Sequence, residues 1–209
     1  MLHAVASPEW ADSADPAVAV FLHGYGSDER DLLALVSALP PGLPWASLRA
    51  PIALGPGAHA WFRITEPGNP DPAPVAAATD AIWAWVDEEL PASTRVIPIG
   101  FSQGGLMASQ LLRTAPDRVL APVILGGFVQ AAPQPADAAL TRTLPAVFSG
   151  RGEEDRVIAA AAVARTETWL DAHTTATARR YPGLAHGIDA RELADVREFL
   201  AQQLAAAGR

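Results

Sequence analysis

Gly100-Phe101-Ser102-Gln103-Gly104 is the stretch that decides how this chain folds. It lies between residues 95–99, a short apolar run typical of a strand, and residues 105–113, whose spacing predicts an amphipathic helix. A serine in a tight turn between strand and helix keeps its Oγ exposed. The glycines two positions before and after it remove Cβ atoms that would clash in that turn. The stretch therefore predicts a nucleophile elbow, and its alternative interpretation is a βα loop with an ordinary serine.

The composition is that of a globular protein with an acidic balance. The 209 residues fit one domain, and half of them are apolar while 18% are charged. The net charge of −8 argues against a nucleic-acid partner, because phosphate binding needs clustered basic residues. All 15 basic residues are arginine. The lack of lysine excludes Walker-type phosphate loops, Schiff-base chemistry and a Ser-Lys nucleophile pair.

Cysteine is absent, which excludes disulfides, thiolate metal sites and a cysteine nucleophile. Residues 1–8 lack the basic and apolar regions of a signal peptide. The longest strongly apolar run, near residues 119–129, is too short to cross a bilayer. We therefore expect a cytoplasmic protein with no stable membrane insertion, no metal and no cofactor.

Short apolar runs alternate with helical patterns along the chain. We expect strands at 17–22, 45–50, 95–99, 119–125, 146–148 and 177–181, and helices at 28–39, 75–90, 105–113, 156–172 and 189–207. Two segments, 51–74 and 128–144, are predicted to be irregular. This alternation predicts an α/β fold with a mostly parallel sheet and helices on both faces, formed by residues 1–209 as a single domain without a lid.

The carboxyl ends of two later strands carry an acid and a base. Asp155 follows the strand at 146–148, and His186 follows the strand at 177–181. Functional groups gather at the carboxyl ends of the strands in an open α/β sheet. The chain order Ser102, Asp155, His186 is the one this fold class uses for a catalytic triad. In such a triad the imidazole accepts the serine proton, and the carboxylate fixes the tautomer of the imidazole.

The acid has rivals. Asp155 could instead cap the helix that follows it, and Glu153 and Glu154 are close enough to replace it. We favour Asp155 because Val157 and Ile158 can then begin the helix while the acid stays at the loop tip.

The base is easier to choose, because only His186 lies in a late strand-to-helix loop after the acid. His23 follows a buried strand, where we expect a structural hydrogen-bonding role. The other histidines are predicted to have surface or loop positions; they are His3, His59 and His173.

Acyl transfer also needs backbone N–H donors for the oxyanion that develops on the carbonyl oxygen. The N–H of Gln103 begins the elbow helix and can serve as one donor. We expect the second from Tyr25, because Gly24 and Gly26 let the backbone turn after the first buried strand. The alternative is a plain glycine turn.

Taken together, these motifs resemble the α/β-hydrolase superfamily and, within it, the phospholipase/carboxylesterase family that includes the acyl-protein thioesterases. The matching segments follow the family's order and are Leu22-His23-Gly24-Tyr25-Gly26-Ser27-Asp28, Ala60-Trp61-Phe62, Gly100-Phe101-Ser102-Gln103-Gly104-Gly105, Asp155-Arg156-Val157-Ile158 and Gly183-Leu184-Ala185-His186. The resemblance implies a triad of Ser102, Asp155 and His186, and oxyanion donors at Tyr25 and Gln103. It implies hydrolysis of a small-molecule ester or thioester, and it allows a homodimer.

The chain departs from the family pattern in two places. Its acid loop, residues 150–155, carries more charge than is usual. Its N-terminal region is short, so the family's first antiparallel strands are expected to be reduced or missing.

The segment 51–74 has two interpretations. With Trp61 and Phe62 it can overhang the serine and form the substrate-binding wall of an acyl groove, or it can be a satellite core under a long loop. An open groove favours small or medium-chain esters. Esters and thioesters pass through the same acyl-serine intermediate, so the sequence does not separate them.

Two other functions fit parts of the chain. Gly150 and Gly152 follow a strand, as in dinucleotide-binding loops, but Asp155 replaces the third glycine and would repel pyrophosphate. A non-catalytic binding protein with a hydrolase fold would be expected to lack a triad residue, and none is lacking here. We therefore expect a serine carboxylesterase, with acyl thioesterase or lysophospholipase activity as the alternative.

Overall fold

The computed structural model describes residues 2–10 and 16–208, and their centre is a seven-stranded sheet. The strand order is β1-β3-β2-β6-β7-β8-β9, in which β1 runs antiparallel to β3 and the other neighbours are parallel. The strands are β1 (Ala4–Ala6), β2 (Ala17–Leu22), β3 (Trp45–Leu48), β6 (Arg95–Phe101), β7 (Val123–Leu125), β8 (Ala146–Gly152) and β9 (Thr175–Tyr181). The expected parallel sheet is confirmed, and the N-terminal antiparallel part is reduced to β1.

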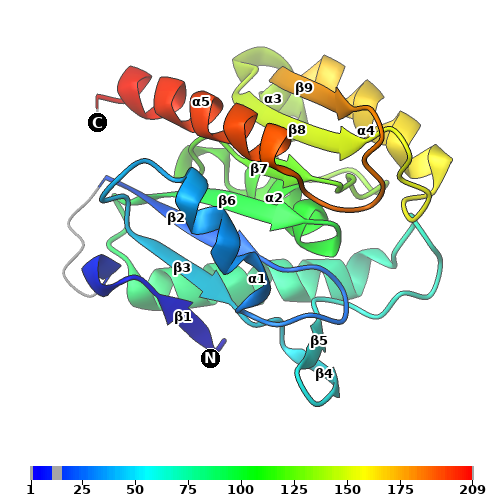
Figure 1. The fold of residues 1–209 in the computed structure, drawn as a ribbon, viewed down its shortest axis with the longest axis horizontal. Helices are drawn as coiled ribbons and strands as arrows, with labels where there is room; N and C mark the ends of the chain where they lie inside the picture. Colours follow the sequence, from blue (N-terminus) through cyan, green and yellow to red (C-terminus); the bar gives the residue numbers. More distant parts are fainter. Residues whose placement is uncertain (1, 11–15, 209) are drawn as a thin grey trace.

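Helices cover both faces of this sheet, as expected (Figure 1). They are α1 (Pro72–Glu89), α2 (Gln103–Thr114), α3 (Asp137–Thr143), α4 (Ala160–His173) and α5 (Ala190–Ala206), with short 3-10 helices η1 (Pro8–Trp10), η2 (Asp31–Ala38) and η3 (Pro116–Arg118). In Figure 1, α5 and η2 lie in front of the sheet, whereas α1, α2 and α4 lie behind it.

Strand β2 shows why both faces must be covered. All six of its residues are buried, and their side chains alternate between two cores. Val18, Val20 and Leu22 join the core under α1 and α2, while Phe21 and its alternate neighbours join the core under η2 and α5. A strand buried on both sides in this way is typical of a parallel sheet, which holds its ends in fixed positions.

Three segments differ from the expected pattern. The segment 51–74 contains a hairpin of β4 (Ile52–Gly55) and β5 (Ala58–Ala60), and 128–144 contains α3. Both elements are short and lie among prolines and glycines, which hide their periodicity. The expected helix at 28–39 is the 3-10 helix η2, in which each turn holds three residues rather than 3.6.

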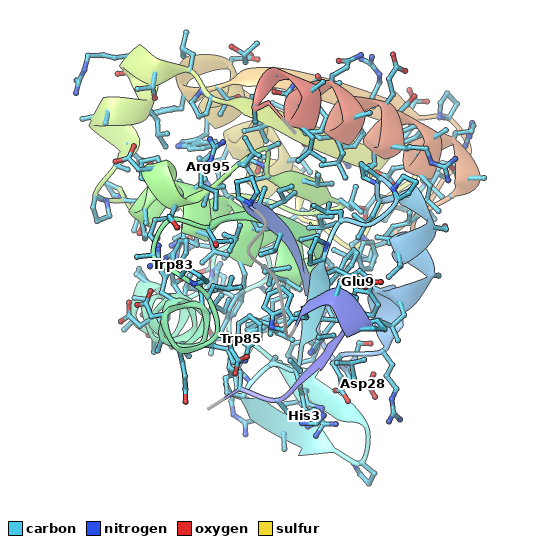
Figure 2. The ribbon with its side chains drawn as sticks, turned by 90° about the vertical axis from the view of Figure 1, so that its left-hand side faces the viewer. His3, Glu9, Asp28, Trp83, Trp85 and Arg95 are labelled. Carbon is cyan, nitrogen blue, oxygen red and sulfur yellow. The ribbon has the colours of Figure 1, made fainter. Side chains whose placement is uncertain are left out.

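Aromatic side chains of α1 pack near the end of the sheet at which the strands begin, where Figure 2 labels Trp83 and Trp85. Trp85 leaves α1 and stacks on Trp10, with ring centroids 5.4 Å apart. Trp83 donates its indole N–H to Thr114 of α2 and packs against the Arg118 guanidinium.

One carboxyl group is buried in the core near the carboxyl end of β8. Glu192, in the first turn of α5, is fully buried, and neither of its carboxyl oxygens has a hydrogen-bond partner among the described residues. A Cβ on Gly150 of β8 would lie 2.0 Å from Glu192 Oε1, so the glycine leaves the space that the carboxyl fills. Burial raises the pKa of Glu192 to about 8, and the charges of Asp189 and Asp195 add to the effect.

The Glu192→Gln variant should remove a pH dependence of stability. The folded-state pKa is about 8 and the ordinary value is 4.5, so the folded protein holds an extra proton between these values. Its free energy of unfolding should therefore fall as the pH rises through this window. The variant should lose this slope and exceed the parent at pH 8 by on the order of a few kcal/mol. Urea unfolding across this window measures it. Glu198→Gln, exposed on the same helix, is the control, and an unchanged slope in Glu192→Gln would contradict the prediction.

Candidate active site

Ser102 occupies a strained turn between β6 and α2. Its φ is 54° and its ψ is −113°, a region that residues with a side chain rarely adopt. The backbone N–H of Ser102 donates a hydrogen bond to the carbonyl of Leu125, at 2.8 Å, which ties the turn to the end of β7. Strain of this kind persists only where the surroundings enforce it, and it is concentrated at functional sites.

The two motif glycines are what allow the turn. A Cβ on Gly100 would lie 2.0 Å from the carbonyl oxygen of Gly104, and a Cβ on Gly104 would lie 1.8 Å from the carbonyl oxygen of Leu22. The first turn of α2 therefore lies directly against the ends of β6 and β2. The expectation that these glycines remove clashing Cβ atoms is confirmed.

Asp155 and His186 meet across the ends of β8 and β9. Asp155 Oδ2 accepts a hydrogen bond from His186 Nδ1 at 2.8 Å. Asp155 Oδ1 accepts from the backbone N–H groups of Val157 at 2.9 Å and Ile158 at 3.3 Å. Asp155 does not cap the following helix, whose N-cap residue is Ala159. The helix itself begins later than expected, at Ala160, so these N–H groups belong to the turn that precedes it.

The surroundings of Asp155 favour its charged form. Burial alone raises its pKa, but the hydrogen bonds from His186 and from the backbone of Val157 outweigh burial, and the pKa lies below its ordinary value. A carboxylate that accepts from Nδ1–H leaves Nε2 of His186 free to accept a proton. The rival acids Glu153 and Glu154 are exposed on the same loop.

The His186 ring lies against both sides of the Ser102 turn. Its centroid is 4.8 Å from that of Phe101, the residue before Ser102. A Cβ on Gly126 would lie 3.4 Å from His186 Cε1, and Gly126 directly follows the carbonyl that holds the Ser102 N–H. The structure therefore gathers the three predicted residues at the carboxyl ends of β6, β8 and β9.

Two unpaired backbone donors adjoin Ser102. Within residues 2–10 and 16–208, the N–H groups of Tyr25 and Gln103 have no hydrogen-bond acceptor. A Cβ on Gly24 would lie 3.6 Å from Ser102 Cβ, which places the loop of Tyr25 beside the serine. Donors left open in this way can stabilise an anion that forms at the serine.

His23, at the start of the same loop, has the structural role expected for it. Its Nδ1 hydrogen-bonds the carbonyl of Gly24 at 2.7 Å, and its Nε2 accepts from the N–H of Ala50 at 3.0 Å. The ring is fully buried, and burial lowers its pKa. His23 therefore stays neutral and holds the loop in place.

The Gln103 side chain clamps a segment that is distant in the sequence. Its Oε1 accepts from the N–H of Trp61 at 2.8 Å, and its Nε2 donates to the carbonyl of Phe62 at 2.7 Å. Trp61, only 1% exposed, donates its indole N–H to the carbonyl of His23 and lies in the main core. Phe62 lies in the same core, and unlike Trp61 it also lines the cavity described next.

A cavity of about 260 Å³ opens above Ser102. Besides Tyr25, Ser102 and Gln103, its lining consists of Phe62, Ile64, Glu66, Pro67, Gly68, Pro70, Phe128, Val157 and Ile158. Most of this wall is apolar. Three large side chains of the lining are partly exposed and form an apolar rim: Tyr25 is 44% exposed, Ile64 50% and Val157 63%. Such a lining suits an acyl chain better than a polar group.

The outer wall of the cavity is held by side chains that the sequence analysis did not identify. Arg165 of α4 donates to the carbonyls of Val129 and Gly68, at 3.0 and 2.5 Å. Gln130 donates to the carbonyl of Pro70 at 2.9 Å. These partners are 36 to 97 residues apart in the sequence, and no local pattern signals such contacts.

The part of the chain that the structure describes contains no group of three or more His, Cys, Asp or Glu side chains arranged to hold a metal ion. In the same part, none of the helices combines the length and the apolar character that spanning a membrane requires.

Comparison with known proteins agrees with this geometry. A family model described as Phospholipase/Carboxylesterase matches residues 3–204. Among curated proteins, none matches the sequence significantly.

Solved structures show the same fold. A carboxylesterase from Bacillus cereus superposes with a TM-score of 0.80 at 23% identity, covering 97% of this chain and 95% of the other. A carboxylesterase from Mesorhizobium loti gives 0.75 at 21% identity, covering 96% and 93%. SOBER1 from Arabidopsis thaliana gives 0.72 at 20% identity, covering 90% and 99%. At these identities the likeness establishes the fold, which is the α/β-hydrolase fold.

The Gly104→Ala variant should be strongly destabilised. Its new methyl group would overlap the carbonyl of Leu22, and only a movement of backbone can relieve the overlap. We expect a loss of about 3 kcal/mol or more in the free energy of unfolding, measured in urea. Gly55→Ala is the matched control, because a Cβ there meets no atom within 4 Å. Equal stability of the two variants would show that α2 does not depend on this contact.

Proposed function

This chain belongs to the phospholipase/carboxylesterase family of α/β-hydrolases, and we propose that it is a serine carboxylesterase that works through an acyl-serine intermediate. The observation that carries the proposal is the hydrogen bond between Asp155 and His186, formed beside the strained turn at Ser102. Nucleophile, base and orienting acid are the three parts that this chemistry needs.

In the first half-reaction, Ser102 Oγ attacks the carbonyl carbon of the ester while His186 Nε2 takes the hydroxyl proton. Asp155 holds the Nδ1–H and stabilises the imidazolium that forms. The carbonyl oxygen becomes an oxyanion, which accepts hydrogen bonds from the unpaired N–H groups of Tyr25 and Gln103. The bond from carbon to the alcohol oxygen then breaks, and His186 returns the proton to the departing alcohol.

The second half-reaction repeats these steps with water. His186 takes a proton from water, whose oxygen attacks the acyl carbon. The bond to Ser102 Oγ then breaks, and the proton returns to the serine as the carboxylic acid leaves. No group beyond the side chains and backbone already described is required.

The cavity supports small or medium acyl chains. Its volume of about 260 Å³ is just below the range usual for ligand sites, and its wall is formed largely by Phe62, Ile64, Phe128, Val157 and Ile158. A thioester would follow the same steps, because its acyl carbon forms the same acyl-serine. A series of p-nitrophenyl esters and matched thioesters of increasing chain length therefore defines the preferred substrate.

The Ser102→Ala variant should abolish turnover. Without Oγ no acyl-enzyme can form, so the burst of p-nitrophenol from p-nitrophenyl butyrate should disappear and kcat should fall by roughly a thousandfold or more. Stopped-flow absorbance measures both. An unchanged rate in a folded Ser102→Ala protein would refute the mechanism.

The Asp155→Asn variant should show whether Asp155 or its neighbour Glu154 is the acid. It keeps the shape of the side chain but removes the charge that orients His186 and stabilises the imidazolium, so kcat should fall by roughly a thousandfold or more. Glu154→Gln changes an exposed residue of the same loop and should keep the parent rate. If only the Glu154 variant loses activity, the acid has been assigned to the wrong residue.

A further inference from the structure

A second hollow adjoins the cavity above Ser102. Its volume is about 460 Å³, and it lies between the acid loop, the start of α4 and the end of β9. Ile158 lines both hollows, which places them side by side. Arg151, Arg156 and Arg180 also line it, and we call it the arginine groove. It lies at the edge of the sheet where β8 and β9 end, on the right of Figure 1.

The arginine groove has spare positive charge. Arg180 is paired with Glu167, and Asp155 is engaged by His186 and the backbone. Within residues 2–10 and 16–208, neither Arg151 nor Arg156 has a hydrogen-bond or ion-pair partner for its side chain. Arg63 and Arg95 also lack a side-chain partner among the described residues, but Arg151 and Arg156 differ from them in lining the same hollow.

The acidic residues closest in sequence do not cancel this charge inside the groove. Glu153 and Glu154 lie on the same loop, yet neither is among the described residues that form the groove lining. Their side chains are exposed, as is that of Arg156, so water and salt screen these charges alike.

The start of α4 adds to the same field. The helix has 14 residues, its N-cap residue is Ala159, and its first turn has no acidic residue. In the part of the chain that is described, the N–H groups of Ala160 and Ala161 have no acceptor. Free N–H groups and the helix dipole both favour an anion at this end.

We propose that the arginine groove binds an anionic group, a carboxylate or a phosphate, carried by the ester that Ser102 cleaves. Guanidinium groups bind both anions through paired N–H donors. The apolar part of the substrate would pass Val157 and Ile158, which lie between the serine and the arginines. This inference rests on the proposed esterase function, and it gives a role to Arg151 and Arg156, which the catalytic steps do not use.

The anion can be part of the acid or of the alcohol of the ester, and two matched pairs of substrates distinguish these sources. Mono-p-nitrophenyl glutarate against p-nitrophenyl butyrate places a carboxylate on the acyl side. 4-Carboxyphenyl butyrate against phenyl butyrate places it on the alcohol side. For each pair, kcat/KM is measured with the parent, with Arg156→Gln and with the double variant Arg151→Gln/Arg156→Gln.

The parent should prefer the anionic member of one pair. The double variant should lower kcat/KM for that ester by about fivefold to twentyfold and leave its neutral partner unchanged. Sodium chloride at about 0.5 M should reduce the preference in the parent, because salt screens exposed charges. Arg156→Gln alone should show part of the loss, and it covers the case in which the half-buried Arg151 cannot be replaced without unfolding.

Arg95→Gln is the control, because Arg95 begins β6 and so lies at the opposite end of the strands from the groove (Figure 2). The inference is overturned if the parent prefers neither anionic ester, or if the variants slow the anionic and neutral esters equally. Hydrolysis of the neutral butyrates tests the esterase proposal by itself. If the parent cleaves them without any charge preference, only the groove inference fails; if it cleaves none of the four esters, the esterase proposal fails.

Discussion

The contact on which the site depends is the close approach of a helix to two strands. The start of α2 lies so near the ends of β2 and β6 that a single methyl group at Gly104 would overlap the carbonyl of Leu22. This approach forces Ser102 into its left-handed conformation and aims the open end of α2 at the serine. The strain of the turn is offset by the packing of the buried strands around it, which cannot move apart without opening both cores.

Several residues of the site hold more than one partner, so the loops are fixed to each other rather than to the sheet alone. Asp155 joins His186 to the turn before α4 through its two oxygens. His23 joins the loop of Tyr25 to the backbone at Ala50, and it does so as a neutral ring because burial disfavours its charge. Each of these hydrogen bonds fixes the orientation of a side chain or a loop, and together they make a site built on loops rigid.

The fold and much of the site could be predicted because their signals are local. Glycines around Ser102 and the buried run of β2 each reflect a steric or hydrophobic demand made by adjacent residues. What could not be predicted depends on partners distant in the chain. The hydrogen bond from Arg165 to the carbonyl of Gly68 spans 97 residues, and the hydrogen bond from the Trp61 indole to the carbonyl of His23 spans 38. Short elements such as the hairpin of β4 and β5 could not be predicted, because three or four residues are too few to show a strand pattern.

Gln103 has a consequence that reaches beyond its place in the motif. Its backbone N–H has no acceptor among the described residues, and its side chain hydrogen-bonds the backbone of Trp61 and of Phe62, which lines the cavity. One residue therefore joins the turn of Ser102 to the wall of the cavity, and in the proposed mechanism it also donates to the oxyanion. In that mechanism, a substrate that displaces Phe62 would displace this donor as well. Discrimination among acyl chains should accordingly be expressed in the speed of turnover more than in the tightness of binding.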